Sequence, residues 1–204
     1  MSAILRPAIV IFVLLTLITG IAYPLAVTGI AQAVFADRAN GSLIMRDGEA
    51  VGSSLIGQDF SGDPKYFWGR LSATGPVPYT AFNAAKATGS SGSNLGPTNP
   101  ALLENARARI EALKAADVAV GYARPADQRV PIDLVTSSAS GLDPHVSLAA
   151  AEYQAPRVAK ARGMDQASVR AAVTRHTRGR ALGLLGEPVV NVLEVNFDLD
   201  GLAP

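Results

Sequence analysis

Four residues with the side-chain types of a hydrolase triad stand close together in the chain: Ser138, Ser140, Asp143 and His145. A serine nucleophile, a histidine base and an orienting carboxylate act together only in a defined geometry. The sequence has no Gly-x-Ser-x-Gly turn to expose the serine, and residues this close along the chain do not require a triad. We therefore expect no catalytic residue here and predict that His145, after Asp143 and Pro144, fixes a turn through hydrogen bonds.

Metal chemistry has equally little support in the sequence. The chain has two histidines, His145 and His176, and no cysteine, so a thiolate site cannot form. The histidines do not form a His-x-x-x-His pair. We predict no metal site, and we expect His176 to lie near a helix C-terminus, where an imidazole interacts favourably with the helix dipole.

A stretch rich in glycine and serine, residues 88–97, precedes a predicted helix. Backbone N–H groups of such a loop and a helix N-terminus can together hold an anion. The stretch lacks the Gly-Lys-Ser/Thr ending of a P-loop, so no lysine is placed for a terminal phosphate. The pattern alone favours a structural loop over a phosphate site.

Three adjacent aromatic residues and a cation, Tyr66-Phe67-Trp68-Gly69-Arg70, offer either an interface anchor or a wedge in the core. Alternate aromatic side chains of an extended segment can point inward, and the core interpretation is favoured for that reason.

The N-terminal region carries no charged side chain from Pro7 to Ala36. About 20 apolar residues in a helix cross a bilayer core, so the sequence predicts a transmembrane helix over residues 8–34. A cleaved signal peptide is the alternative, because residues 31–33 resemble a cleavage site, but the apolar run is long for one. Arg6 before the helix favours a cytoplasmic N-terminus and an external domain.

The remaining residues, 38–204, are enough for one soluble domain with its own core. Eighteen Lys and Arg residues against 17 Asp and Glu residues leave a net charge of +1, which argues against a nucleic-acid partner. The fold class predicted is α+β, with a small sheet and about three helices. Periodicity and capping residues place a hairpin at 42–56, a long ordered loop at 59–99, helices at 100–116, 147–163 and 165–179, and strands at 130–136 and 193–199.

Several motifs together resemble the C subunit of the bacterial Kdp potassium-transporting P-type ATPases (the KdpC family). They occur in order along the whole chain: residues 55–58 (LIGQ), 66–70 (YFWGR), 92–100 (GSNLGPTNP), 130–136 (VPIDLVT), 140–145 (SGLDPH), 153–154, 157–159, 176–177, 179–180 and 186–194 (GEPVVNVLE). The sequence departs from the family pattern at Leu71, Thr80 and Ser91, all in the long loop.

The resemblance implies an accessory subunit without catalytic activity of its own, in the inner membrane of a bacterium. Its complex would contain a channel-like potassium-binding subunit, an ATP-hydrolysing P-type subunit and a small peptide subunit, and would use ATP, magnesium and potassium. The resemblance implies no cofactor bound to this subunit itself.

Two accounts of the subunit's role follow from the resemblance. It is expected either to assemble the complex and assist ATP hydrolysis as a catalytic chaperone, or to raise ATP affinity by binding the nucleotide directly. The second account would use Gln58, Gly92, Ser93, Asn94 and Gly96. For contacts with other subunits the candidates are Tyr66, Phe67, Trp68, Arg70, Asp143 and His145.

Overall fold

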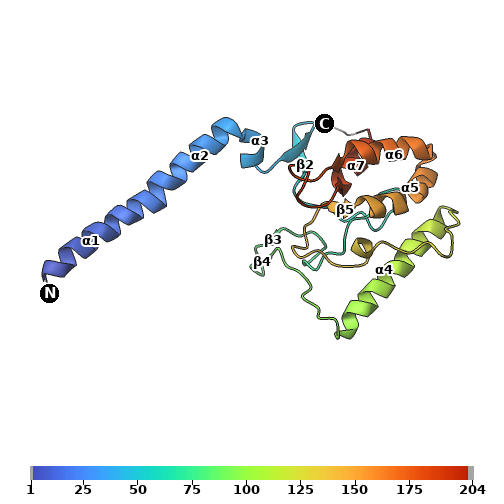
Figure 1. Cartoon of the computed structure of the whole chain (residues 1–204), viewed down its shortest axis with the longest axis horizontal. Helices are drawn as coiled ribbons and strands as arrows, with labels where there is room; N and C mark the ends of the chain where they lie inside the picture. The colour runs from blue at the N-terminus through green and yellow to red at the C-terminus, as the bar shows by residue number, and fades with distance from the viewer. Residues whose placement is uncertain (1, 202–204) are drawn as a thin grey trace. The chain divides into compact units, whose positions relative to one another are not determined.

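The computed structural model describes residues 2–201, and the chain divides into two compact units, Met1–Leu43 and Ile44–Pro204. The first unit is dominated by one long helix, drawn in blue in Figure 1. The second unit contains the remaining helices and strands. The soluble part therefore mixes helices with small sheets, which confirms the predicted α+β class.

The long helix consists of α1 (Ser2–Leu17), a wide turn of π-helix (Ile18–Ala22) and α2 (Tyr23–Val34). Its 31 residues from Ile4 to Val34 are long and apolar enough to cross a membrane, judged by length and composition. The π turn has a local cause: in a regular α-helix the ring of Pro24 would clash with the carbonyl group of Gly20. A single turn, α3 (Ala36–Ala39), follows.

The second unit begins with the predicted hairpin, formed by β1 (Leu43–Arg46) and β2 (Glu49–Ser53). Asp47 and Gly48 adopt the positive φ angles, 50° and 83°, that a tight hairpin turn needs. In the long loop, β3 (Phe82–Asn83) and β4 (Thr88–Gly89) form a second, very short hairpin.

A three-stranded antiparallel sheet has the strand order β5-β7-β6. Its strands are β5 (His145–Ser147), β6 (Thr177–Arg178) and β7 (Val189–Asn191). Val190 of the central strand pairs with Val146 on one side and with Thr177 on the other. The two valines are buried and join the sheet to the core.

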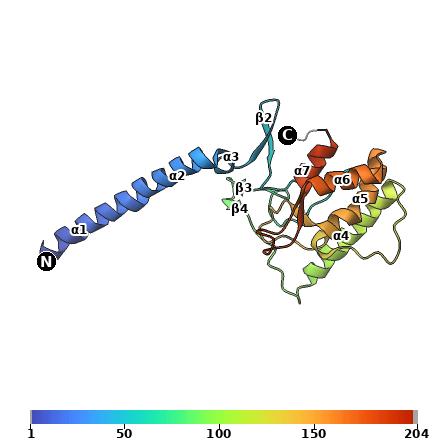
Figure 2. The same cartoon turned by 45° about the horizontal axis from the view of Figure 1, so that its top comes forward.

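The second unit also contains four helices, α4 (Pro100–Ala119), α5 (Leu148–Arg162), α6 (Gln166–Arg175) and α7 (Val192–Leu199), of which α5 and α7 contact this sheet. In both views α5 lies between α4 and the α6–α7 pair (Figures 1 and 2). The core is built mainly from small and β-branched side chains of α5, α6, α7 and the sheet: Ala150, Ala155, Val158, Val169, Val173, Val190, Val192 and Val195.

The helix starts predicted from capping residues are confirmed, whereas the third predicted helix, 165–179, ends already at Arg175, and residues 177–178 form strand β6. The side chains of Asn99, Ser147 and Asp165 each accept a hydrogen bond from a backbone N–H in the first turn of α4, α5 and α6 respectively. Gly163 ends α5 in the left-handed conformation, with φ of 62°. Pro156 lies inside α5 and does not interrupt the helix.

Both strands predicted outside the hairpin are wrong. Residues 130–136 contain a short 3-10 helix (Ile132–Leu134) after Pro131, and the Ile132 side chain is 76% exposed. Residues 193–199 belong to α7, which Asn191 caps by accepting a hydrogen bond from the N–H of Glu194 at 3.1 Å. In a run of seven residues, alternating apolar side chains are compatible with two turns of helix as well as with a strand. The helix cap at Asn191 favours the helix.

Candidate functional site

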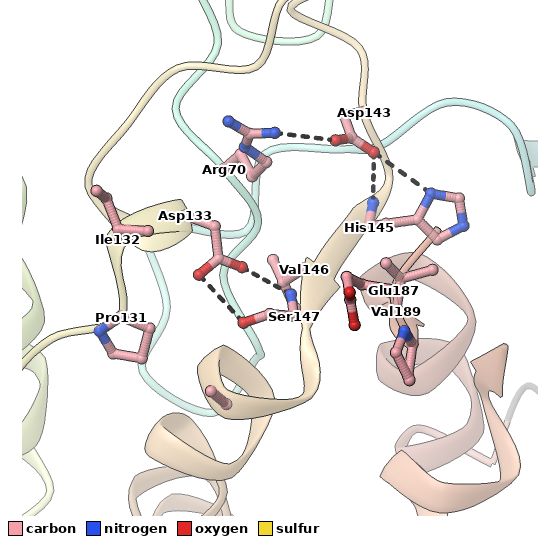
Figure 3. Close-up of a pocket in the computed structure, with 12 residues that line it drawn as sticks. Arg70, Pro131, Ile132, Asp133, Asp143, His145, Val146, Ser147, Glu187 and Val189 are labelled. Atoms are coloured by element: carbon pink, nitrogen blue, oxygen red, sulfur yellow. Dashed lines mark hydrogen bonds and ion pairs between the residues drawn. The ribbon is translucent and has the colours of Figure 1, made fainter. Parts of the chain in front are cut away.

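A cleft of about 460 Å³ lies where the 3-10 helix, β5 and the start of β7 come together (Figure 3). Its apolar walls include Pro131, Ile132, Pro188 and Val189. Its charged side chains are Arg70, Asp133, Asp143 and Glu187, and the His145 imidazole also lines it. Three of the predicted contact residues, Arg70, Asp143 and His145, are therefore brought together here, although 73 positions separate the first two.

Asp143 is the centre of this cluster. One carboxylate oxygen accepts the backbone N–H of His145 at 3.0 Å and lies 3.3 Å from its Nδ1, while the other lies 3.4 Å from Nη1 of Arg70. Burial raises the pKa of Asp143, but the hydrogen bonds from His145 and the charges of His145 and Arg70 outweigh it and hold the pKa below its ordinary value. Asp143 therefore stays ionised and holds both partners in place.

Arg70 also connects the cluster to the preceding turn, because its Nη2 donates to the carbonyl oxygen of Ser137 at 3.1 Å. Arg70 Nε and His145 Nε2 are shielded from solvent and have no hydrogen-bond partner among the described residues. The predicted turn at His145 is present: its backbone and its ring both face the same carboxylate, as Figure 3 shows.

Asp133 forms a second polar contact across the cleft (Figure 3). It accepts hydrogen bonds from the backbone N–H of Ser147 at 2.6 Å and from its hydroxyl group at 3.2 Å. The Ser147 hydroxyl oxygen in turn accepts the N–H of Ala150 and caps α5. The sequence analysis missed Asp133 because it assigned this residue to a strand. A role in holding the capping residue Ser147 was therefore not considered.

The residues with triad side-chain types are not arranged as a triad. Ser140 Oγ accepts the backbone N–H of Leu142 at 3.1 Å, which makes a local turn. Ser138 Oγ is buried and has no hydrogen-bond partner within residues 2–201, so it is not bonded to His145. Over the same residues, no group of three or more acidic or histidine side chains is placed to hold a metal ion.

Of the aromatic contact candidates, Phe67 and Trp68 lie in the core, with 1% and 3% of their surface exposed. The favoured core interpretation holds for these two, and neither presents its ring to another subunit at the surface. Tyr66 is partly buried, and its hydroxyl group donates to Asp200 at 3.0 Å. The cleft residues are therefore the better candidates for contacts.

Gln58 and Gly92 are occupied with other contacts, whereas Asn94 and Gly96 are open to their surroundings. Nε2 of Gln58 donates to the carbonyl oxygen of Val51 at 2.8 Å. Gly92 packs so closely that an added Cβ atom would lie 2.7 Å from the carbonyl oxygen of Ala139, whereas a Cβ atom on Gly96 would meet nothing within 4 Å. Asn94 is exposed and has a positive φ of 51°.

The surroundings of this loop offer little for a phosphate group. Ser93 lines a shallow cavity of about 390 Å³ that also contains Arg109. Arg109 already donates to the carbonyl oxygens of Leu134 and Gly69, at 3.2 and 2.8 Å, and burial lowers its pKa. At the start of α4, the Asn99 side chain accepts the N–H of Ala101, and Pro100 has no N–H. The first turn of α4 therefore offers an anion neither an N–H at Pro100 nor a free N–H at Ala101.

Comparison with known proteins identifies close relatives over the whole chain. A family model described as "K+-transporting ATPase, c chain" matches residues 5–201. A potassium-transporting ATPase KdpC subunit from Sorangium cellulosum is 60% identical over 201 residues, which cover 98% of this chain and 99% of that protein. KdpC subunits from Polaromonas naphthalenivorans and Dechloromonas aromatica are 58% and 57% identical over 100% of this chain, covering 97% and 100% of their own lengths.

Proposed function

This chain belongs to the KdpC family of potassium-transporting ATPase subunits, and from that membership we propose that it is a non-catalytic accessory subunit. It assembles and stabilises the complex and assists the ATP-hydrolysing subunit as a catalytic chaperone. Its partners are a channel-like potassium-binding subunit, the P-type ATPase subunit and a small peptide subunit. The ATP, magnesium and potassium that the complex uses are bound by those partners.

The observation that carries this proposal is that the carboxylates of the cleft already form hydrogen bonds or ion pairs with neighbouring residues. Asp143 is held between Arg70 and His145, and Asp133 accepts two hydrogen bonds from Ser147, the residue that caps α5. Glu187 forms an ion pair with Arg180, with 2.7 Å between Nη2 and Oε2. A carboxylate that acts as a general base needs an oxygen free to accept a proton from a substrate. Carboxylates already committed to neighbours instead suit a fixed surface that another protein contacts.

The apolar helix Ile4–Val34 supports a single membrane span. We further propose that the N-terminus is cytoplasmic, because Arg6 precedes the helix and positive charge favours the cytoplasmic side. The soluble domain then lies on the outer side of the inner membrane, near the outer mouth of the potassium-binding subunit.

The test of this placement is a C-terminal alkaline phosphatase fusion in intact bacterial cells, with a parallel fluorescent fusion that matures in the cytoplasm. High phosphatase activity is the expected result, and it would exclude direct contact between the domain and cytoplasmic ATP. A fluorescent fusion without phosphatase activity would overturn the placement.

The rival candidate is a nucleotide-binding regulatory module that contacts ATP through Gln58 and residues 92–96. The positive φ of Asn94 and the close approach of Gly92 to Ala139 define a shaped loop, which is the observation in its favour. This candidate predicts saturable ATP binding by the full chain in detergent, lost when Asn94 is replaced by a bulky residue. Absence of ATP binding would exclude the nucleotide-binding module and leave the accessory role.

A further inference from the structure

The loop between β6 and β7, residues 179–188, carries three leucines that are largely exposed. Leu182, Leu184 and Leu185 are 92%, 80% and 65% exposed. Single exposed leucines are common on protein surfaces, but a cluster at the tip of one loop marks a surface that binds something apolar. Residues 181–186 contain no charged side chain.

The leucines are held by a turn that satisfies its own backbone. Ala181 and Leu185 exchange two N–H to carbonyl hydrogen bonds, of 2.8 and 2.9 Å, and the N–H groups of Gly183 and Leu184 donate to Arg180 and Ala181. Leu182 and Gly183 have successive positive φ angles of 54° and 75°. The leucines are thus presented on a defined turn, which lowers the entropy cost of binding compared with an unstructured loop.

The charged residues at the base of the loop are neutralised in pairs. Nη2 of Arg178 lies 2.7 Å from Glu194, and Nη2 of Arg180 lies 2.9 and 2.7 Å from the two oxygens of Glu187. An apolar centre surrounded by paired charges matches the anatomy of a protein interface. A lipid surface would instead favour unpaired cations and aromatic side chains, and residues 179–188 contain no aromatic residue.

The loop also continues into the cleft. Glu187, Pro188 and Val189 line it, and in Figure 3 Glu187 and Val189 lie on the wall opposite Asp133. The chain that carries the leucines therefore leads directly into the cleft that contains Asp143.

We propose that the leucine loop is a docking element, which inserts Leu182, Leu184 and Leu185 into an apolar groove of another subunit of the potassium-transporting ATPase. This inference rests on the membership of the complex, but it requires neither the external placement of the domain nor a particular role in ATP hydrolysis. The partner's groove is apolar, and its rim carries no large net charge.

The absence of cysteine from the chain allows a direct test. Leu184→Cys places a single thiol at the tip of the loop, and Val118→Cys places one on α4 at a position of similar exposure, 75%. Each full-length variant is reacted with a small maleimide that crosses bilayers, once alone in liposomes and once in the assembled complex. Labelling of the same samples after unfolding sets the full extent.

The expected result is fast labelling of both variants in liposomes and a loss confined to Leu184→Cys in the complex. There its rate should fall about tenfold or more, because the core of an interface excludes water. Equal labelling of Leu184→Cys in both samples would overturn the proposal, since nothing then covers the loop. Protection already present in liposomes would assign the loop to lipid. An equal loss at Val118→Cys in the complex would reflect general shielding of the domain and would also overturn it.

Discussion

Two stretches of the long loop 59–99 are stabilised in opposite ways. In the aromatic segment 66–70, buried side chains from distant helices bind the backbone. The amide of Gln154 accepts the N–H of Trp68 at 2.8 Å and donates to its carbonyl oxygen at 3.1 Å, and the amide of Asn196 pairs with both backbone groups of Phe67 at 2.9 Å. In the glycine-serine segment 89–97, the N–H of Ser91 and the hydroxyl of Ser90 donate to the same carbonyl oxygen, that of Ser140.

The aromatic segment also holds buried charge. The guanidinium groups of Arg109 and Arg157 both lie over the Trp68 ring, at 4.8 and 4.6 Å from the ring centre. Burial lowers the pKa of Arg157 to about 10, although Asp117 nearby opposes the shift. The stability of a segment held by particular side chains depends on which residues those side chains belong to. The stability of a segment held mainly through its own backbone depends on whether there is room for added atoms. The mutations that follow test this difference, starting with the largest expected effect.

Replacing Trp68 by alanine should lower the free energy of unfolding by about 3–5 kcal/mol, because it opens a cavity and removes the ring that two buried guanidinium groups contact. The matched change in the same loop, Phe82→Ala, removes an exposed ring and should cost less than about 0.5 kcal/mol. Urea unfolding of the full chain in detergent, followed by far-UV circular dichroism, measures both. Equal losses would show that the Trp68 ring contributes no more to stability than an exposed ring of the same loop.

The change Gln154→Leu keeps the side-chain volume and removes the amide that binds the backbone of Trp68. It should cost about 1–3 kcal/mol, because a buried N–H and a buried carbonyl group lose their partner. It also removes the 2.7 Å hydrogen bond from Arg157 to Gln154. The exposed change Gln128→Leu is the control and should leave the urea midpoint nearly unchanged. A stable Gln154→Leu variant would mean that packing alone holds the aromatic segment.

Two glycine-to-alanine substitutions in the glycine-serine segment make the same change in composition but differ in the space available for the new Cβ atom. Gly92→Ala should destabilise the domain by about 1–3 kcal/mol, since the new Cβ atom would press on the backbone of Ala139. Gly96→Ala has open space and should be neutral or slightly stabilising. If ATP binding is lost in Gly96→Ala while thermal stability is unchanged, the loop would instead have a role in binding nucleotide.

The sequence predicted those features that short-range chemistry decides. Asn99, Ser147 and Asp165 cap their helices through bonds to residues two or three positions away, and the Asp47-Gly48 turn is equally local. Residues 193–199 alternate like a strand, and this alternation outweighed the cap of Asn191, which is as local as the other three, so the helix there was not predicted. Asp133 was missed for a related reason: its partner Ser147 is 14 positions away.

Among the contact candidates too, contacts between sequence neighbours could be predicted and contacts between distant residues could not. The motif containing Asp143 and His145 was found from the sequence, and their mutual contact is local. The pairing of Arg70 with Asp143 depends on a fold that joins residues 73 positions apart. The exposed leucines at 182–185 were overlooked because a short apolar run between glycines looks the same whether it is buried or exposed.

The smallest expected effect concerns the point where the aromatic segment ends, at the ion pair of Arg70 with Asp143. The folded-state pKa of Asp143 lies below its ordinary value of 3.8, so the native protein binds fewer protons there than the unfolded chain does. Its contribution to stability is complete above that value and is lost as the pH falls through the lower, folded-state pKa. The side chain is 30% exposed, so we expect less than about 1 kcal/mol.

Asp143→Asn should therefore cost a small, constant amount of unfolding free energy above about pH 5, and the difference from the unchanged protein should shrink as the pH drops below 4. Urea unfolding at a series of pH values measures it, with the exposed change Asp127→Asn as the control, which should show no such trend. A difference that stays constant down to pH 3 would mean that Asp143 acts through packing or hydrogen-bond geometry rather than through its charge. In that case the cleft would be held as the aromatic segment is, by particular side-chain contacts, and Arg70→Met would be tolerated better than Asp143→Asn.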